Sequence, residues 1–150
     1  MNTLRHSVEI KATKETVWQV LWDDKTFRDW ANIIDPGTYM TGELQEGNEV
    51  NFIGNSDDGV SFGVTSRVEK LIPYSHISFE QVADITVGND GSIKKRKTQW
   101  TGGKETYELE EHDDTVTLSH TQDVPDELVT YFNDKLPQAL KRIKSLAETL

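Results

Sequence analysis

The sequence contains no cysteine, and this absence excludes several kinds of site. A chain without thiols has no disulfide framework, no cysteine nucleophile and no thiolate-bound metal. Its four histidines do not have the spacing of a metal-binding pair, and no HExxH pattern occurs. We therefore expect no metal site, and nothing in the sequence indicates a cofactor.

Basic residues are also scarce, with 16 Lys and Arg against 26 Asp and Glu and a formal net charge of −10. Because nucleic acids and anionic membranes are bound largely through basic side chains, this composition argues against both partners. The one basic run, at residues 94–97, follows an Asn-Asp-Gly turn without interleaved aromatic residues. That pattern is typical of a solvated loop.

Long apolar segments and long linkers are absent as well. No stretch has the length and apolar character of a membrane span or a signal peptide, so a cytoplasmic location is the default expectation. No internal repeat divides the chain, and we predict a single domain over residues 1–150.

What the chain does have is regular spacing of its apolar residues. Apolar and polar side chains alternate over residues 4–12 and again from residue 39 to about residue 121, which indicates antiparallel strands with one wet face. Residues 55–59 predict a hairpin turn, whereas the pattern over residues 82–103 leaves the structure open. Between the strand regions, helical spacing predicts two short helices, the first after Thr13 as N-cap.

The last part of the chain predicts a long helix that begins near Pro125. Its apolar stripe consists of Val129, Phe132, Leu136, Ala139, Leu140, Ile143, Leu146 and Ala147. A helix about 10 Å wide cannot cover six or seven strands that are about 4.8 Å apart. The sheet must therefore curve and leave an apolar cavity. We predict an α+β, helix-grip fold: a curved antiparallel sheet of six to seven strands wrapped around the long C-terminal helix, with two short helices after the first strand.

Candidate ligand-binding residues are those that this arrangement directs inward. They are Trp30, Phe52, Phe62, Phe79, Trp100, Tyr107, His120, Phe132 and Leu136. The alternative for each aromatic residue is plain core packing. Trp100 and Tyr107 are the stronger candidates, because each has a polar atom that a wet cavity can satisfy.

His120 and Glu105 are the only candidates for catalysis. Alternation places both on the inward face of neighbouring strands. A histidine and a glutamate within reach of each other could act as acid and base. The alternative is a structural histidine satisfied in the interior, and the sequence leaves this choice open.

Several segments carry a family resemblance: IKATKETVW at 10–18, FRDW at 27–30, the strands over 63–79 and TVTLSHT at 115–121, followed by the long helix. The chain resembles the activator-of-heat-shock-chaperone-ATPase homologues within the START and birch-pollen-allergen-like (SRPBCC) superfamily. Members often carry a doubled tryptophan where Trp30 stands alone. The resemblance implies a helix-grip fold and, by analogy, a chaperone partner.

Three functional hypotheses follow. The first is a binding protein that holds a small hydrophobic or aromatic ligand between the long helix and the sheet. The second is a chaperone-associated interaction protein. The third is a cyclase, dehydratase or hydrolase that uses His120, either alone or together with Glu105. We expect a monomer or a weak dimer.

Overall fold

The computed structural model describes residues 1–54 and 60–150, and the hairpin turn expected at residues 55–59 lies outside the described residues. The elements in order are β1 (Asn2–Ile10), α1 (Lys14–Trp22), α2 (Asp24–Ile34), β2 (Tyr39–Thr41), β3 (Glu49–Gly54), β4 (Ser61–Ile72), β5 (His76–Val87), β6 (Ile93–Arg96), β7 (Lys104–His112), β8 (Thr115–Val124), a 3-10 turn (Asp126–Leu128) and α3 (Val129–Glu148). This order confirms the predicted α+β, helix-grip architecture.

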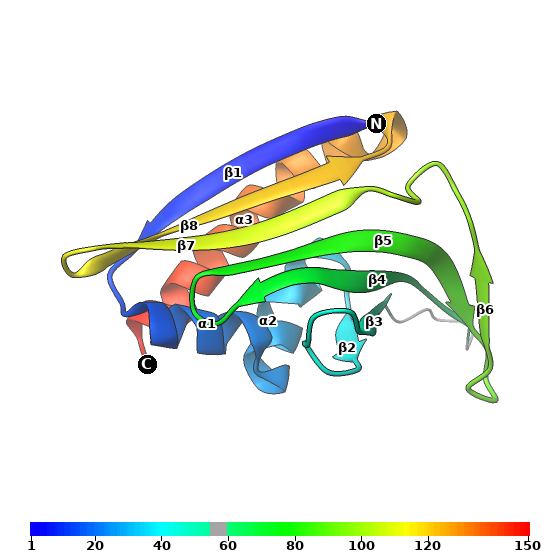
Figure 1. The fold of residues 1–150 in the computed structure, drawn as a ribbon, viewed down its shortest axis with the longest axis horizontal. Coiled ribbons are helices and arrows are strands. Elements are labelled where there is room, and N and C mark those ends of the chain that lie inside the picture. The colour runs from blue at the N-terminus through cyan, green and yellow to red at the C-terminus, as the bar shows by residue number, and fades with distance from the viewer. Residues whose placement is uncertain (55–59) are drawn as a thin grey trace.

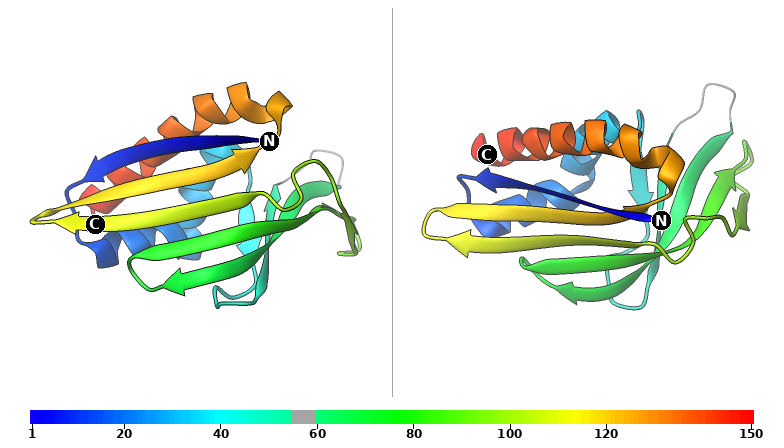
Figure 2. Two further views of the ribbon diagram at one scale, coloured as in Figure 1. Left: turned by 45° about the horizontal axis from the view of Figure 1, so that its top comes forward. Right: turned by 90° about the horizontal axis from the view of Figure 1, so that it is seen from above.

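The strands form one antiparallel sheet in the order β1-β8-β7-β5-β4-β3-β2, and β6 pairs with β5 away from this path. The sheet has eight strands rather than six to seven; the shortest are β2 and β6. Figure 1 shows the long strands side by side, with the helices behind them. In Figure 2, α3 lies along one face of the sheet, and β3 and β4 turn up past its N-terminal end.

The helices form where the apolar spacing predicted them. The Thr13 side chain caps α1 by accepting a hydrogen bond from the Thr16 backbone N–H at 3.2 Å. The long helix begins four residues after Pro125, because a 3-10 turn precedes it. Each helix buries one stripe against the sheet: Val17, Val20 and Leu21 in α1; Phe27, Trp30 and Ala31 in α2; Phe132, Leu136, Ala139, Leu140, Ile143 and Ala147 in α3. No helix among the described residues is long and apolar enough to cross a membrane.

Two features bend the sheet beside the start of α3. The pairing of β4 with β5 shifts between Thr65 and Ser66, where Val82 is an extra residue on β5, and shifts again between Val68 and Lys70. Such bulges increase twist and bend the strands. At Gly63 the β3 backbone comes so close that a Cβ atom would lie 2.1 Å from the Phe52 carbonyl oxygen. The curvature therefore depends on a residue without a side chain.

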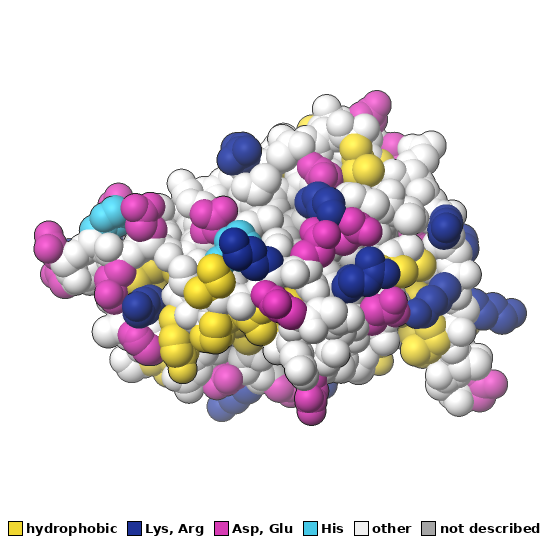
Figure 3. Space-filling view, viewed as in Figure 1, with side chains coloured by type: hydrophobic (Ala, Val, Ile, Leu, Met, Phe, Trp, Pro, Cys, Tyr) yellow, Lys and Arg dark blue, Asp and Glu magenta, His cyan; other side chains and the backbone are white. Residues whose placement is uncertain are grey.

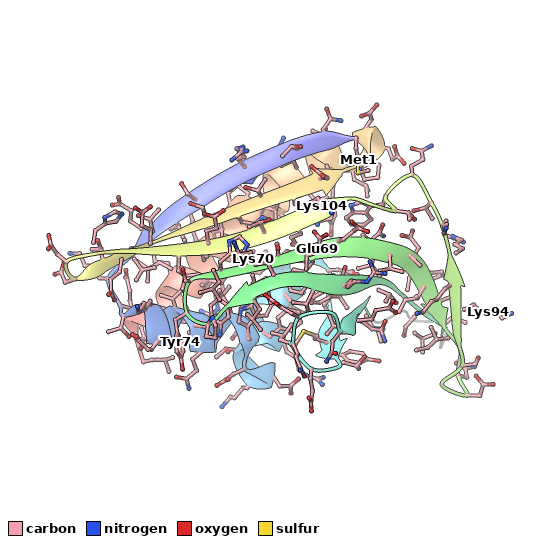
Figure 4. All side chains as sticks on the ribbon, viewed as in Figure 1. Met1, Glu69, Lys70, Tyr74, Lys94 and Lys104 are labelled. Atoms are coloured by element: carbon pink, nitrogen blue, oxygen red, sulfur yellow. The ribbon has the colours of Figure 1, made fainter. Side chains whose placement is uncertain are left out.

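Residues 82–103, which the pattern left open, continue the sheet. Strand β5 extends to Val87, and β6 pairs back onto it after a turn at Gly91, where φ is +82°. The prediction that residues 94–97 form a loop is wrong for 94–96, which belong to β6. Their side chains are exposed at the sheet edge, where Figure 4 shows Lys94 pointing away from the protein. Pairing with β5, and not apolar alternation, makes this segment a strand.

The outer face of the sheet is polar. Figure 3 shows acidic and basic side chains interspersed over it. Lys104, labelled beside Glu69 in Figure 4, lies 2.8 Å from the Glu69 carboxylate and 2.5 Å from that of Glu80. One wet face and one covered face are typical of an antiparallel sheet packed on a helix.

Candidate ligand-binding cavity

A cavity of about 470 Å³ lies between α2, the first turn of α3 and the curved part of the sheet. Small-molecule sites commonly have volumes of about 300–1,000 Å³. Phe62 and Tyr131 line the cavity and are 56% and 41% exposed, so they mark its opening to solvent. The other lining residues are Phe27, Trp30, Ala31, Ile34, Asp35, Thr38, Phe52, Gly54, Gly63, Val64, Asp84, Trp100, Glu105, Tyr107, Gln122, Leu128 and Phe132.

Six of the nine residues predicted to bind a ligand line this cavity: Trp30, Phe52, Phe62, Trp100, Tyr107 and Phe132. The other three lie in the packing around it. Phe79 is 1% exposed and makes an edge contact with Phe52, their ring centroids 5.6 Å apart. Leu136 is buried among Leu4, Val124 and Phe132. The third, His120, lies behind Glu105. Ligand binding by these residues stays a prediction.

Glu105 and His120 meet at the inner wall of the cavity. His120 Nε2 lies 2.7 Å from Glu105 Oε2, and the Tyr107 hydroxyl donates to the same oxygen at 3.1 Å. His120 is 1% exposed, whereas the Glu105 side chain is 22% exposed and lines the cavity. Glu105 and Tyr107 are thus the members of the trio that line the cavity, and Glu105 carries the charge there. Its carboxylate could accept a hydrogen bond, hold a cation or exchange a proton with His120.

The surroundings of this trio keep the phenol of Tyr107 protonated. Burial first, and then the neighbouring Glu105, raise the pKa of Tyr107 well above its ordinary value. On the other side of β8, the paired strand β1 places His6 opposite His120. Burial lowers the pKa of His6, and His120 lowers it further, while a hydrogen bond with Asn133 opposes the change. Within the described residues, neither His6 Nδ1 nor His120 Nδ1 has a hydrogen-bond partner.

Two further carboxylates line the cavity, Asp35 and Asp84, and neither is among the residues predicted from the sequence. Asp35 follows the last residue of α2, and burial raises its pKa. It lies so close to Gly54 that a Cβ atom there would be 2.3 Å from Asp35 Oδ2. Alternation from Phe79 would direct Asp84 outward, but the bulge at Val82 changes the side on which it projects. A gap in the alternation of β5 was the one available signal.

A small side chamber of about 40 Å³ adjoins the main cavity. The two share Val64, Trp100, Glu105 and Gln122, and the chamber also borders Phe79 and Gln81. Gln81 is 6% exposed and donates from Nε2 to Asp84 Oδ1 at 2.6 Å. No three His, Asp or Glu side chains within residues 1–54 and 60–150 are placed to hold a metal ion.

Comparisons with known proteins agree with this architecture. Protein CV1439 from Chromobacterium violaceum superimposes with a TM-score of 0.70 at 17% identity, over 99% of both chains. The Aha1 dimer from Colwellia psychrerythraea gives 0.65 at 21% identity, over 99% of this chain and 97% of that one. DynU16, from the dynemicin biosynthetic locus, gives 0.68 at 16% identity, and this chain spans only 48% of its length. At such identities the likeness shows the fold alone.

No curated protein has significant sequence similarity to the chain. One family model does match, over residues 11–148, and it describes activator of Hsp90 ATPase homolog 1-like proteins. The match extends from the end of β1 to the last residue of α3. The chain therefore belongs to the family of activator of Hsp90 ATPase homolog 1-like proteins.

Proposed function

We propose that this protein binds a small, largely apolar molecule in the cavity between α2, α3 and the curved sheet. The observation that carries the proposal is a cavity of about 470 Å³ whose wall contains six of the predicted aromatic and apolar residues. Most of its wall is formed by helices and paired strands, which hold a preformed site better than loops do. Apolar cavities with a few polar groups are the usual form of small-molecule sites.

The proposal can be tested with the tryptophans of the wall. Trp30 and Trp100 line the cavity, so a bound ligand changes their fluorescence. We would screen a panel of lipids and aromatic compounds by fluorescence, melting temperature and backbone NMR shifts. Absence of any response to the whole panel would refute the proposal.

A matched pair of variants locates the binding. Val64→Phe adds volume inside the cavity, whereas Ile93→Phe adds it at a residue that is 45% exposed on β6. We expect Val64→Phe to weaken binding at least about tenfold and Ile93→Phe to leave it unchanged. Equal effects of the two variants would place the ligand elsewhere.

A second candidate function is association with a chaperone, which the family match favours. Figure 3 shows hydrophobic side chains gathered near the β4–β5 turn, where Figure 4 places Tyr74. Ile72 and Tyr74 are 45% and 44% exposed there, and Tyr74 contacts Trp18. Purified Hsp90-type chaperone should bind the wild type, and Tyr74→Ser should bind less. Failure of the wild type to bind would remove this candidate.

Catalysis is a weaker candidate function than ligand binding or chaperone association. His120 is separated from the cavity by the Glu105 carboxylate with which it is hydrogen-bonded. A general base must reach the proton that it removes. His120 could act on a cavity ligand only through Glu105.

A further inference from the structure

The charged side chains that line the cavity are all acidic. They are Asp35, Asp84 and Glu105, and no Lys, Arg or His is among the described residues that line this main cavity. Lys104 borders the side chamber, but its ammonium group is already paired with Glu69 and Glu80. Glu105 is paired with His120, but the hydrogen bonds that Asp84 receives from described residues come only from the neutral side chains of Gln81 and Thr98. Asp35 has no hydrogen bond or ion pair to its carboxylate from the described residues. Withdrawing carboxylates from water without cations is unfavourable, and a bound cation offsets that cost.

The hydrogen-bond donors on the aromatic residues of the wall are already used. Trp30 Nε1 donates to the Val20 carbonyl at 3.2 Å, and Trp100 Nε1 donates to the Asp123 carbonyl at 2.7 Å. The Tyr107 hydroxyl donates to Glu105, and the Tyr131 hydroxyl donates to the backbone carbonyl of the last residue of α2. The aromatic residues therefore offer a ligand no free N–H or O–H, whereas the three carboxylates offer acceptors, which favours a ligand that donates.

The side chamber provides an independent sign of a missing donor. Gln81 Oε1 is buried there and has no hydrogen-bond partner within the described residues. The amide nitrogen donates to Asp84 Oδ1 at 2.6 Å, and a flipped amide would place two acceptors against each other. The free atom is therefore an oxygen acceptor. A buried acceptor without a donor is unfavourable, and a ligand N–H would satisfy it.

Aromatic rings complete the environment. Phe52, Trp30 and Tyr107 border the same cavity as Glu105 and Asp84. The faces of such rings attract ammonium groups. A wall of rings, carboxylates and a free amide oxygen suits an apolar molecule with a positive group, and it repels an apolar carboxylate such as a fatty acid.

We propose that the cavity selects an apolar amine, with its ammonium group near Asp84, Glu105 and Gln81 and its apolar body against the aromatic wall. This inference rests on the proposed binding function and names its ligand class. The test compares three probes with one ring system: 2-(1-naphthyl)ethylamine, 2-(1-naphthyl)ethanol and 1-naphthylacetate. Dissociation constants measured by tryptophan fluorescence and calorimetry at neutral pH should favour the amine over the carboxylate by at least about tenfold.

Variants of the two carboxylates test whether amine affinity depends on their charge and not on the shape of the cavity. Asp84→Asn and Glu105→Gln keep the size of each side chain and remove one negative charge. Each should weaken amine binding by about tenfold and weaken binding of the uncharged alcohol much less. Glu110→Gln is the matched control, because that side chain is 77% exposed outside the cavity. Retention of full amine affinity in both cavity variants would overturn the inference.

The outcomes also show whether a failure concerns the selectivity for amines or ligand binding as such. Equal or tighter binding of the carboxylate would overturn the charge selection and leave the binding function standing. If none of the three probes binds, the ligand obtained from the broader panel decides: a cationic ligand supports the inference and an anionic or neutral one overturns it. Absence of any ligand overturns both proposals.

Discussion

Glu105 Oε2 lies 2.7 Å from His120 Nε2, and this contact joins the cavity to the buried core of the sheet. The two residues come from neighbouring strands, β7 and β8, and Tyr107 stands directly opposite His120 with their ring centroids 4.6 Å apart. His120 thus has two functions in the fold: its side chain packs in the buried core, and it donates a hydrogen bond to a carboxylate that faces the cavity.

Replacing His120 should therefore destabilise the protein. His120→Ala removes a side chain that is 1% exposed and deprives Glu105 of a donor, so we expect a loss of about 2–4 kcal/mol in the free energy of unfolding. Urea denaturation measures it. His120→Gln, which can still donate, should lose less. The exposed His112 is the control, and its replacement by Ala should change stability by less than about 0.5 kcal/mol. Equal losses at the two histidines would contradict this account.

His6 should make stability depend on pH near neutrality. Its folded pKa lies below the ordinary value of 6.5, chiefly through burial. The unfolded chain therefore takes up a proton that the folded chain resists. The contribution of His6 is fully present above pH 6.5 and is lost as the pH falls through that value toward the lower folded pKa.

The measurement compares the wild type with His6→Gln in urea at about pH 7.5 and about pH 5.5. We expect the variant to lose less stability between these two pH values than the wild type does. His112→Gln is the matched control and should keep the wild-type dependence. If His6→Gln retains the full pH dependence, His6 is not its source.

Sequence patterns predicted the parts of the site that follow regular alternation. Glu105, Tyr107 and His120 lie on strands whose alternation is unbroken, so their common face could be read directly. Asp84 was missed because Val82 is an extra residue in β5, and the gap in the alternation of β5 does not tell which residue is the extra one. Asp35 was missed because it belongs to no periodic element.

The same reasoning applies to the fold. Long helices and strands bury continuous apolar stripes, and those stripes were visible in the sequence. Strand β6 buries none of its side chains, and only its pairing with β5 makes it a strand. Phe79 and Leu136 show the remaining limit: spacing identifies the inward face but does not tell which inward residues reach the cavity.

Gly63 provides a test of the curvature that shapes the cavity. A Cβ atom at this position would lie 2.1 Å from the Phe52 carbonyl oxygen, so β3 or β4 must shift to admit any side chain. We expect Gly63→Ala to destabilise the protein by about 1–3 kcal/mol, measured by urea denaturation. Gly88→Ala is the control, since its nearest neighbours, at 3.1 Å, are the side chains of Asp90 and Ser92, which can move. A tolerated Gly63→Ala would contradict the close approach of the strands.

The pair Asp29 and Arg142 links α2 to α3, the two helices that close the cavity. Arg142 donates from Nε and from a terminal nitrogen to the two Asp29 oxygens, at 2.7 and 2.9 Å. This hydrogen bonding is the main reason that the pKa of Asp29 is below its ordinary value of 3.8. The pair therefore stabilises the fold above pH 3.8, and the contribution is lost as the pH falls through the lowered folded pKa.

Because the two side chains are 42% and 38% exposed, the contribution of this pair is small. We expect Arg142→Met to lower the urea midpoint only slightly at neutral pH, and less in high salt. The cost, measured as the difference in urea midpoint from the wild type, should shrink as the pH falls from 3.8 toward the lowered folded pKa of Asp29, because the unfolded chain takes up the proton first. Lys141→Met, on the same helix turn but exposed, removes a positive charge without breaking the pair. If both variants show the same cost at every pH, the effect comes from net charge and not from the link between α2 and α3.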